Sequence, residues 1–238
     1  MTAADRINLK AGAKKQVLDQ FKFYFLLAIL WLALNWVSEM ISDRNVSGLQ
    51  RILEGTDSLA TSAGALSFAG LLVIVSLMLR AGVQLTMVDL DRGTAQFDNP
   101  MQRGFKLFED SHYFWGWVGI SILAGIFVFF WSWLLFIPGI IKTYSYSQAF
   151  YIYRDAYDQG HPITVLEAIT RSRHMMDGNK GFLFVMDLSF ILWFMLSGLF
   201  FGIPAIFVMP YYDQTRAKFY NQLVVRQAAQ AGANSSLN

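Results

Sequence analysis

Long apolar runs separated by short polar segments dominate the chain. Three of the runs have the roughly 20 apolar residues that a helix needs to cross about 30 Å of hydrocarbon; they are 23–40, 66–88 and 114–137. A fourth run, 182–209, is too long for one crossing and is interrupted by Gly202 and Pro204. The pattern therefore predicts a polytopic helical membrane protein, with the polar segment 41–62 as an extramembrane connection.

A proline turn occurs twice, at an offset in the range of internal repeats. Residues 137–140 read Ile-Pro-Gly-Ile, and residues 203–206 read Ile-Pro-Ala-Ile. Each turn follows an apolar run and precedes a mixed apolar and aromatic segment, so each is expected to join two antiparallel spans. The first turn adds a predicted span at 139–157, and the second divides the fourth run into predicted spans at 182–200 and 204–224. Together with the three clear runs, this gives six spans in three hairpins.

Amphipathic segments lead into the hairpins. Asn99 followed by Pro100 is typical of a helix start, and Thr164 with Glu167 forms the pattern of a capping box. Behind both starts, apolar side chains recur at helical spacing against charged ones, and the first twenty residues show a similar mixture. We predict three amphipathic interfacial helices; they cover 5–20, 99–111 and 164–177.

The composition agrees with a membrane location. Of the 238 residues, 55% are hydrophobic and only 15% are charged, whereas soluble proteins carry roughly 25% charged residues. The chain has no cysteine, which excludes disulfide scaffolds, thiolate metal sites and cysteine nucleophiles. The expected fold class is all-α, a transmembrane helical bundle in a single membrane domain over 1–238.

The positions of lysine and arginine predict the topology, because short cytoplasmic loops retain these residues. With the N-terminus inside, almost all of the basic loop residues fall on the inner side, and Lys142 is one of the few left outside. This arrangement needs the sixth span at 204–224, although that segment contains Asp213, Arg216 and Lys218. We therefore expect a multi-pass protein with its N- and C-termini in the cytoplasm.

Several motifs in the second half of the chain carry a resemblance. Residues 135–147 read Leu-Phe-Ile-Pro-Gly-Ile-Ile-Lys-Thr-Tyr-Ser-Tyr-Ser, and Glu-Ala-Ile at 167–169 and Gly-Asn-Lys at 178–180 follow. This stretch resembles an uncharacterised family of six-helix bacterial membrane proteins, common in lactic acid bacteria and other Firmicutes and known only as a domain of unknown function. The hairpins are more loosely similar to the membrane domain of glycerophosphoryl diester phosphodiesterases. The resemblance implies a bacterial cell membrane location and supplies no catalytic residue.

Placing a charged side chain within the hydrocarbon costs free energy, so each such residue is expected to have an interaction partner or a functional role. Arg80 and Asp187 lie within predicted spans, roughly 10 to 12 Å from the inner ends of their helices at 1.5 Å per residue. Equal depth permits an ion pair. Such a pair could relay protons or ions or bind a substrate, but a structural pair, or an Arg80 that reaches back to the headgroups, is the preferred interpretation.

Three further polar residues lie in or beside predicted spans. Lys142 should lie near the outer interface, where it could reach a lipid phosphate, a helix end or Glu39, or simply extend to water. Asn35 and Gln84 are expected to make hydrogen bonds between helices.

Basic residues cluster on the predicted surface helices and are candidates for contact with anionic headgroups; they are Arg171, Arg173, Lys180, Arg103 and Lys106. Their positions are equally explained by the positive-inside rule alone. No spacing of histidine and carboxylate residues predicts a metal site, and no nucleotide-binding or hydrolase motif is present, so we expect no metal and no cofactor.

The sequence favours a non-enzymatic binding or accessory protein of the membrane. The expected partners are membrane lipids, a peptide or another membrane protein, and not nucleic acid. The alternative is a small transporter or channel that uses an intramembrane pair of Arg80 and Asp187.

Overall fold

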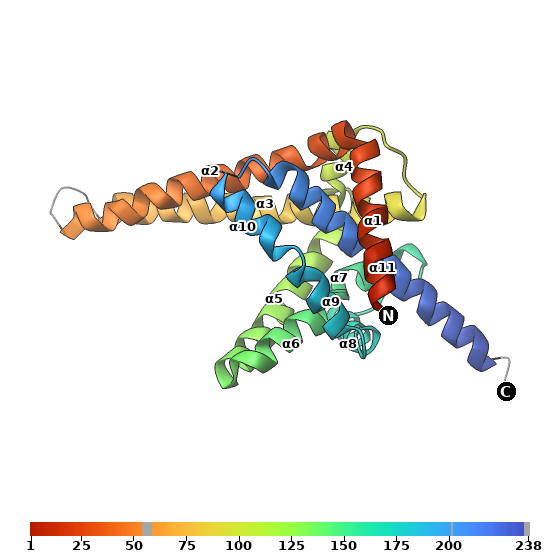
Figure 1. Ribbon diagram of the computed structural model, residues 1–238. Coiled ribbons are helices and arrows are strands. Elements are labelled where there is room, and N and C mark those ends of the chain that lie inside the picture. Colours follow the sequence, from red (N-terminus) through yellow and green to blue (C-terminus); the bar gives the residue numbers. More distant parts are fainter. Residues whose placement is uncertain (54–58, 201, 236–238) are drawn as a thin grey trace.

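The computed structural model describes residues 1–53, 59–200 and 202–235, and within these ranges every regular element is a helix (Figure 1). This confirms the all-helical prediction. The elements are α1 (Ala3–Asp19), α2 (Phe21–Leu53), α3 (Leu59–Arg92), α4 (Pro100–Gly104), the 3-10 helix η1 (Lys106–Phe108), α5 (Ser111–Leu134), α6 (Phe136–Tyr146), α7 (Ala149–Asp158), α8 (Val165–Met175), α9 (Lys180–Leu188), α10 (Ile191–Leu199) and α11 (Ala205–Ser235).

Four helical segments are long and apolar enough to cross a membrane. They are Phe21–Ile41, Ser67–Arg92, Ser111–Trp133 and Lys180–Leu199. These segments coincide with four of the predicted spans and agree with a membrane location. The predicted spans 139–157 and 204–224 correspond to α6 with α7 and to α11, and their crossing of the membrane stays a prediction.

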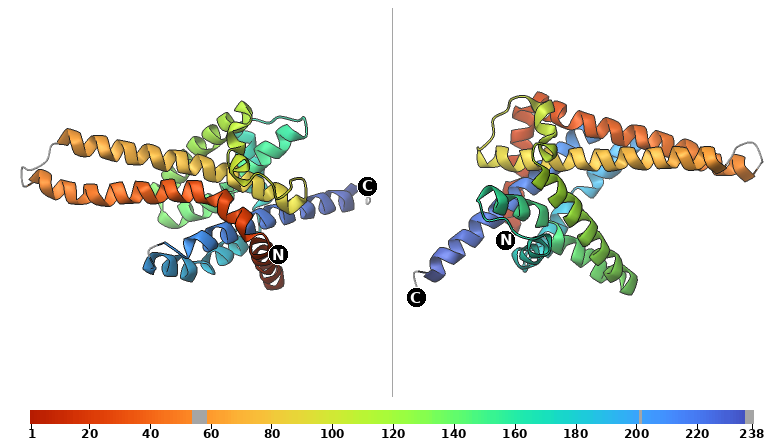
Figure 2. Two further views of the ribbon diagram at one scale, coloured as in Figure 1. Left: turned by 90° about the horizontal axis from the view of Figure 1, so that it is seen from above. Right: turned by 180° about the vertical axis from the view of Figure 1, so that it is seen from behind.

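The helices extend from a common centre (Figures 1 and 2). α2 and α3 lie side by side as one long antiparallel pair, and α5 and α6 form a shorter pair that points in another direction. α11 begins beside α10, passes α3 and α1, and continues to the C-terminal end of the described chain. α11 therefore contacts α1, α2, α3 and α10, while α5 packs against α6, α7 and α8.

The first pair of helices is longer than the sequence predicts. α2 continues to Leu53 and α3 begins at Leu59, so most of the expected connection 41–62 is helical. Residues 54–58 lie outside the described residues. The polar composition of this segment predicted only an extramembrane connection, and a helix already formed in the apolar run propagates at low cost into neighbouring residues.

Two predicted continuous spans are broken in the structure. The predicted span 139–157 divides into α6 and α7, where the Ser147 hydroxyl donates to the Tyr144 carbonyl at 2.9 Å. The span predicted at 182–200 divides into α9 and α10, where the Ser189 hydroxyl donates to the Met186 carbonyl at 2.5 Å. Serine side chains that bond to the preceding turn compete with the helical hydrogen bonds, which accounts for a break that an apolar run cannot reveal.

The predicted surface helices have different outcomes. The helix predicted at 5–20 corresponds to α1 (Ala3–Asp19), and the one predicted at 164–177 corresponds to α8 (Val165–Met175), where the Thr164 hydroxyl accepts the Glu167 backbone N–H at 3.2 Å. The helix predicted at 99–111 is wrong, because this stretch divides into the five-residue α4 and the 3-10 helix η1. Asn99 adopts a left-handed conformation (φ 43°) and makes no capping bond with its side chain.

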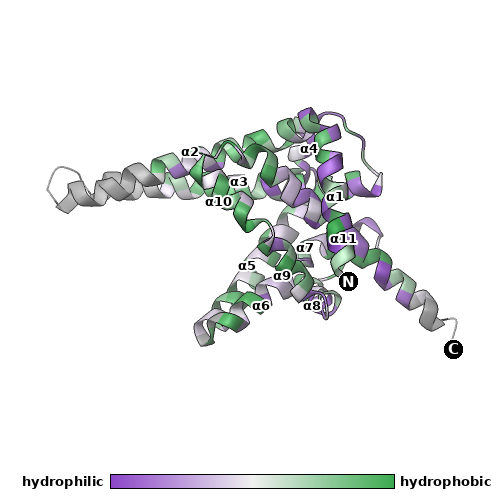
Figure 3. Cartoon of the chain, in the orientation of Figure 1, coloured by the Kyte–Doolittle hydropathy of each residue, from purple (hydrophilic) through white to green (hydrophobic). Residues whose placement is uncertain are grey.

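Large apolar side chains cover much of the outside of the structure. Trp133 is 83% exposed and Phe129 is 66% exposed, both on α5. Figure 3 shows apolar residues along α2, α3 and α10, and polar residues concentrated on α1, α4 and α11. Exposed apolar surface of this extent needs lipid or a partner to cover it.

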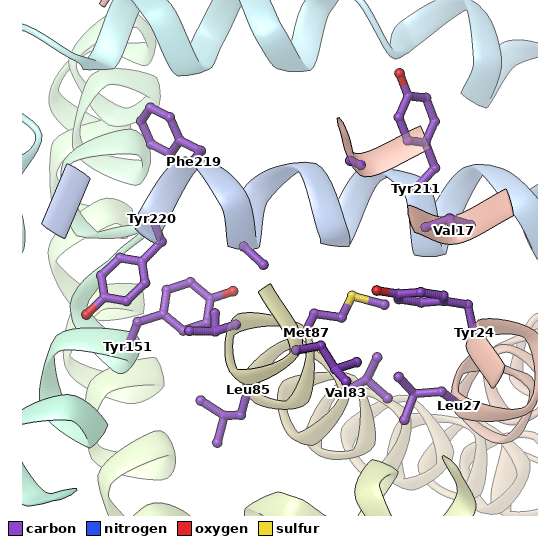
Figure 4. Packing of buried hydrophobic residues seen from close by; sticks show 14 of the residues in the cluster. Val17, Tyr24, Leu27, Val83, Leu85, Met87, Tyr151, Tyr211, Phe219 and Tyr220 are labelled. Carbon is purple, nitrogen blue, oxygen red and sulfur yellow. The ribbon is translucent and has the colours of Figure 1, made fainter. Parts of the chain in front are cut away.

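The buried core lies where α2, α3, α7 and α11 meet (Figure 4). The rings of Tyr151 on α7 and Tyr220 on α11 have centroids 5.0 Å apart, and Met87 of α3 lies beside Tyr24 of α2. These four side chains are each less than 10% exposed. Tyrosine in a core needs partners for its hydroxyl, so this core is expected to contain polar groups as well.

Candidate functional site

The polar groups of the core are organised along α11. Its side chains make hydrogen bonds or ion pairs with α1, α2, α3, α7 and α9, which lie on different sides of it. The α11 residues that make these contacts are Asp213, Gln214, Arg216, Lys218, Tyr220, Asn221 and Arg226. The low hydropathy of the predicted sixth span therefore reflects polar groups that are paired inside the protein.

Arg80 of α3 forms a two-point ion pair with Asp213 of α11. One guanidinium nitrogen lies 2.9 Å from a carboxylate oxygen of Asp213, and Nε lies 3.2 Å from the other. Gln84 donates to the same carboxylate at 3.0 Å, so it makes the hydrogen bond between helices that the sequence predicts. The guanidinium also lies 5.0 Å from the ring centroid of Trp31. The Asp213 side chain is 1% exposed and fully paired.

The predicted pairing of Arg80 with Asp187 is wrong. Asp187 of α9 faces Arg216 of α11, with 3.9 Å between the closest oxygen and nitrogen. Equal depth in the membrane permits a contact, but α11 lies between α3 and α9 and supplies a partner to each. In the described structure the Oδ1 atom of Asp187 is buried and has no hydrogen-bond partner.

A denser group of charges, which we name the charge cluster, lies where α3, α7 and η1 meet. It consists of Asp89, Arg92, Lys106, Arg154, Asp155 and Asp158. Three carboxylates balance three cations, so the charge cluster is neutral without a ligand. A cavity of about 350 Å³ opens onto it.

Arg154 is the most deeply buried member of the charge cluster. Its side chain is 1% exposed and donates to Asp89 and Asp155, each at 2.8 Å. Its Nε atom lies 3.5 Å from an oxygen of Asp158 but makes no hydrogen bond within the described structure. Removal of Arg154 would leave the three carboxylates of the charge cluster with two cations, Arg92 and Lys106.

Asp155 connects α7 to two other helices. Arg92 of α3 donates to its two oxygens at 2.9 and 2.6 Å, and the Tyr220 hydroxyl of α11 donates at 2.7 Å. Bidentate contacts between arginine and a carboxylate are among the strongest hydrogen-bonded pairs in proteins. The charge cluster therefore joins α3, α7 and α11.

A separate contact joins the first helix to α11 near the two chain ends. Arg226 donates to Asp5 at 2.8 Å, and the Thr2 backbone N–H donates to the same carboxylate at 2.6 Å. The backbone N–H of Thr2, and then Arg226, hold the pKa of Asp5 below its usual value. The carboxylate therefore stays charged at neutral pH.

The other predicted polar residues have local contacts. Lys142 lies over the ring of Trp131, with its Nζ atom 4.4 Å from the ring centroid, and its contact is not with Glu39. Asn35 donates to Glu39 at 3.0 Å, so this hydrogen bond lies within α2, whereas the sequence predicts one between helices. Asn35 and Glu39 meet because four residues along a helix bring side chains together, whereas Lys142 reaches Trp131 across the antiparallel pair of α5 and α6.

The basic residues predicted to contact headgroups are engaged to different degrees. Lys106 pairs with Asp89 in the charge cluster, and Arg103 pairs with Asp98. Arg171 pairs with Glu167 at 2.7 Å and Lys180 with Asp177 at 2.8 Å. Among the described residues Arg173 makes no ion pair, and headgroup contact stays a prediction for all five.

Two apolar grooves lie between the helices. The first, the Trp31 groove, has a volume of about 350 Å³ and lies between α2 and the segment from Gly202 to Met209. Trp31 and Glu39 are among its lining residues, and the indole N–H of Trp31 is buried and has no hydrogen-bond partner in the described structure. The second, the α6/α9 groove, has a volume of about 320 Å³ and is lined by Ile137, Ile140, Ile141, Tyr144, Lys180, Gly181 and Phe184.

Sequence reasoning missed most of the paired charges. It assigned Arg154 to the inner side of the membrane as a topology signal and gave Asp155 and Asp213 no partner. A usable signal was present on α11, where Asp213, Arg216 and Tyr220 recur at three- and four-residue spacing and so share one side of a helix.

Part of the chain matches a protein-family model. Residues 133–227 match the model of a family described as "Protein of unknown function (DUF975)". The matched region contains Arg154, Asp187 and Asp213, and it supports the resemblance to an uncharacterised domain family. No curated protein and no solved structure matches the chain.

Proposed function

We propose that this chain is a non-enzymatic, six-span membrane protein that binds a lipid or an apolar peptide from within the bilayer. The observation that carries the proposal is the Trp31 groove. Its walls are mostly apolar, and Trp31, one of its lining residues, has a buried indole N–H without an acceptor in the described structure. An unpaired buried donor is costly, so a ligand that supplies an acceptor oxygen would be held there.

The charges of the core support binding rather than catalysis. Arg80 and Arg154 are each paired with carboxylates of the same chain, so neither is free to hold a substrate. Buried pairs of this kind commonly neutralise each other and fix the positions of helices. Another membrane protein is a third possible partner, since Trp133 and its neighbours present a wide apolar surface.

The proposal is tested by replacing Trp31 with phenylalanine, which removes the N–H and keeps most of the ring. We expect the variant to retain about two- to tenfold less of the co-purifying lipid or peptide, because a single hydrogen bond contributes about 0.5–1.5 kcal/mol. Native mass spectrometry after mild delipidation measures the retained fraction. Trp36→Phe is the matched control, since Trp36 is 58% exposed in the same groove. A wild-type protein that carries no lipid or peptide in any mild detergent would refute the proposal.

A small transporter or channel is the second candidate. It is favoured by the Asp187 oxygen that lacks a hydrogen-bond partner and by the breaks between α6 and α7 and between α9 and α10. Discontinuous helices at membrane depth often line the substrate sites of transporters. In this case the intramembrane pair would be Arg80 with Asp213, or Asp187 with Arg216.

The topology that we propose places both termini in the cytoplasm of a bacterial cell, with α11 as the sixth span. The ion pair between Asp5 and Arg226 supports this arrangement, because it joins the first helix to the last one. The distribution of lysine and arginine supports it independently.

The absence of cysteine allows a direct test of this topology. Single cysteines are introduced at Ala3, Leu135 and Ala229, and intact cells are treated with a membrane-impermeant maleimide. We expect Leu135→Cys to be labelled in intact cells and the other two variants only after permeabilisation. Labelling of Ala3→Cys and Ala229→Cys from opposite sides would contradict six spans.

A further inference from the structure

The Trp31 groove contains a single charged residue, Glu39, among the described residues that line it. Trp31, Asn35 and Glu39 all line the groove and occupy i, i+4 and i+8 positions, so they follow one side of α2. At 1.5 Å per residue, Glu39 lies about 12 Å from Trp31 along the helix axis. The groove therefore has a carboxylate at one level and a buried N–H donor about two turns away.

Glu39 has no cation beside it among the described residues. Its Oε1 atom accepts the hydrogen bond from Asn35 at 3.0 Å, which orients the carboxylate and leaves Oε2 able to accept another. Lys142, the cation that the sequence places within reach, lies over the ring of Trp131 instead. Glu39 belongs to the membrane-crossing segment Phe21–Ile41, where an unpaired charge costs free energy. A cation from outside the chain would lower this cost.

In the six-span topology proposed above, the groove lies in the outer half of the membrane. Glu39 is near the outer end of the first span, and Gly202 and Ile203, which also line the groove, belong to the turn before α11. Trp31 lies deeper. A phospholipid of the outer leaflet presents its groups in the matching order, with the headgroup at the surface, the ester oxygens below it and the acyl chains deepest.

The lining favours a lipid over a peptide. Apart from Asn35 and Glu39, the described lining consists of apolar and aromatic residues and Gly202, and Ile203, Ile206 and Met209 supply the wall opposite α2. A peptide would bring a backbone N–H and C=O at each residue, and such groups are costly without partners in these surroundings. An acyl chain has no such groups, and a phospholipid headgroup can carry the cation that Glu39 lacks.

We infer that the Trp31 groove binds an outer-leaflet phospholipid whose primary ammonium group donates to the Glu39 carboxylate while an acyl chain lies along the apolar wall. The inference rests on the proposed function, since it names the headgroup chemistry for the groove that carries it. A primary ammonium donates charge-assisted hydrogen bonds, which are stronger than neutral ones. A quaternary ammonium has the same charge but no N–H, so the two headgroups are distinguished by this carboxylate.

The inference is tested by native mass spectrometry of the full chain in detergent, titrated with phosphatidylethanolamine or with phosphatidylcholine of the same acyl composition. Both lipids are zwitterionic, so general attraction to basic side chains affects them equally. We expect the wild-type protein to bind phosphatidylethanolamine at least about fivefold more tightly, the effect of one additional charge-assisted hydrogen bond. Glu39→Gln should bind both lipids with similar affinity. Ala33→Leu, which adds bulk to the lining, should weaken the binding of both.

Two control variants distinguish this site from general effects. Glu109→Gln removes an exposed carboxylate that does not line the groove, and the preference for phosphatidylethanolamine should persist. Gly125→Leu adds a side chain at an exposed position where a Cβ atom would meet no atom within 4 Å, and lipid binding should be unchanged. Equal binding of the two lipids by the wild-type protein, or a Glu39→Gln variant that kept the preference, would overturn the inference. Retention of an apolar peptide in place of either lipid would also overturn it.

The same titrations separate the inference from the proposed function. Trp31→Phe should weaken the binding of both lipids to a similar degree, because the indole N–H does not contact the headgroup amine in this arrangement. If both lipids bound equally and their binding depended on Trp31, the headgroup inference would fail and lipid binding in the groove would stand. If neither lipid bound, both would fail.

Discussion

Replacing Arg154 with methionine is expected to lower the free energy of unfolding by about 3–5 kcal/mol, the cost of removing one partner from a buried ion pair. Arg154 is 1% exposed and pairs with both Asp89 and Asp155. Without it, the three carboxylates of the charge cluster would share only two cations, Arg92 and Lys106. The expected result is a large loss of folded protein, measured by fluorescence-detected gel filtration and by thermal unfolding in detergent.

Two variants identify the physical cause of that loss. Arg171→Met removes an exposed arginine whose i,i+4 pair with Glu167 is worth roughly 0.3–0.5 kcal/mol, so it should change stability little. Arg154→Lys keeps the charge but loses the planar fork, and it should give an intermediate stability. Equal stability of Arg154→Met and Arg171→Met would show that the charge cluster does not hold the helices together.

The apolar runs located the helices well because the requirement for about 20 apolar residues is local in the sequence. Phe21–Ile41, Ser67–Arg92 and Ser111–Trp133 all coincide with predicted spans. The breaks at Ser147 and Ser189 could not be found in this way, because a serine in a helix can either point away or bond to the turn before it. Hydropathy does not distinguish these two cases.

The partners of the polar residues depend on which helices are neighbours, and the sequence of a single span does not reveal its neighbours. The equal depth of Arg80 and Asp187 in the membrane permits an ion pair between them, but α11 lies beside both α3 and α9. Asp213 and Arg216 are three residues apart on α11, and they pair with Arg80 and Asp187 respectively. Gln84 was predicted correctly as a contact between helices, because polar groups in apolar spans often bond to another helix, whereas Asn35 bonds to Glu39 on its own helix.

The pairing of charges along α11 explains how a helix of low hydropathy can be central to a membrane protein. The charged side chains of Asp213 and Lys218 are neutralised within the chain, by Arg80 and Asp91. Each ion pair also selects one neighbouring helix, so the pairs determine the arrangement of helices as well as the cost of insertion. If this is their role, the pairs should matter for stability in a coupled way, and loss of one partner should be corrected by loss of the other.

A double-mutant cycle on Arg80 and Asp213 tests that role. Arg80→Gln and Asp213→Asn are each expected to lower thermal stability and yield strongly, because each leaves one charge alone in an apolar region. The combined variant removes both charges and keeps neutral groups that can share a hydrogen bond, so it should recover most of the loss. We expect a coupling free energy of roughly 1–3 kcal/mol, in the upper range for residues in direct contact.

The same cycle on Arg80 and Asp187 is the matched comparison. These two residues have different partners in the structure, Asp213 and Arg216, so their effects should add to within about 0.5 kcal/mol. Strong coupling between Arg80 and Asp187 would contradict the arrangement of α3, α9 and α11 described above. A combined Arg80 and Asp213 variant that remained as unstable as the single variants would show that the charges themselves are needed, and this result would favour the transporter over the binding protein.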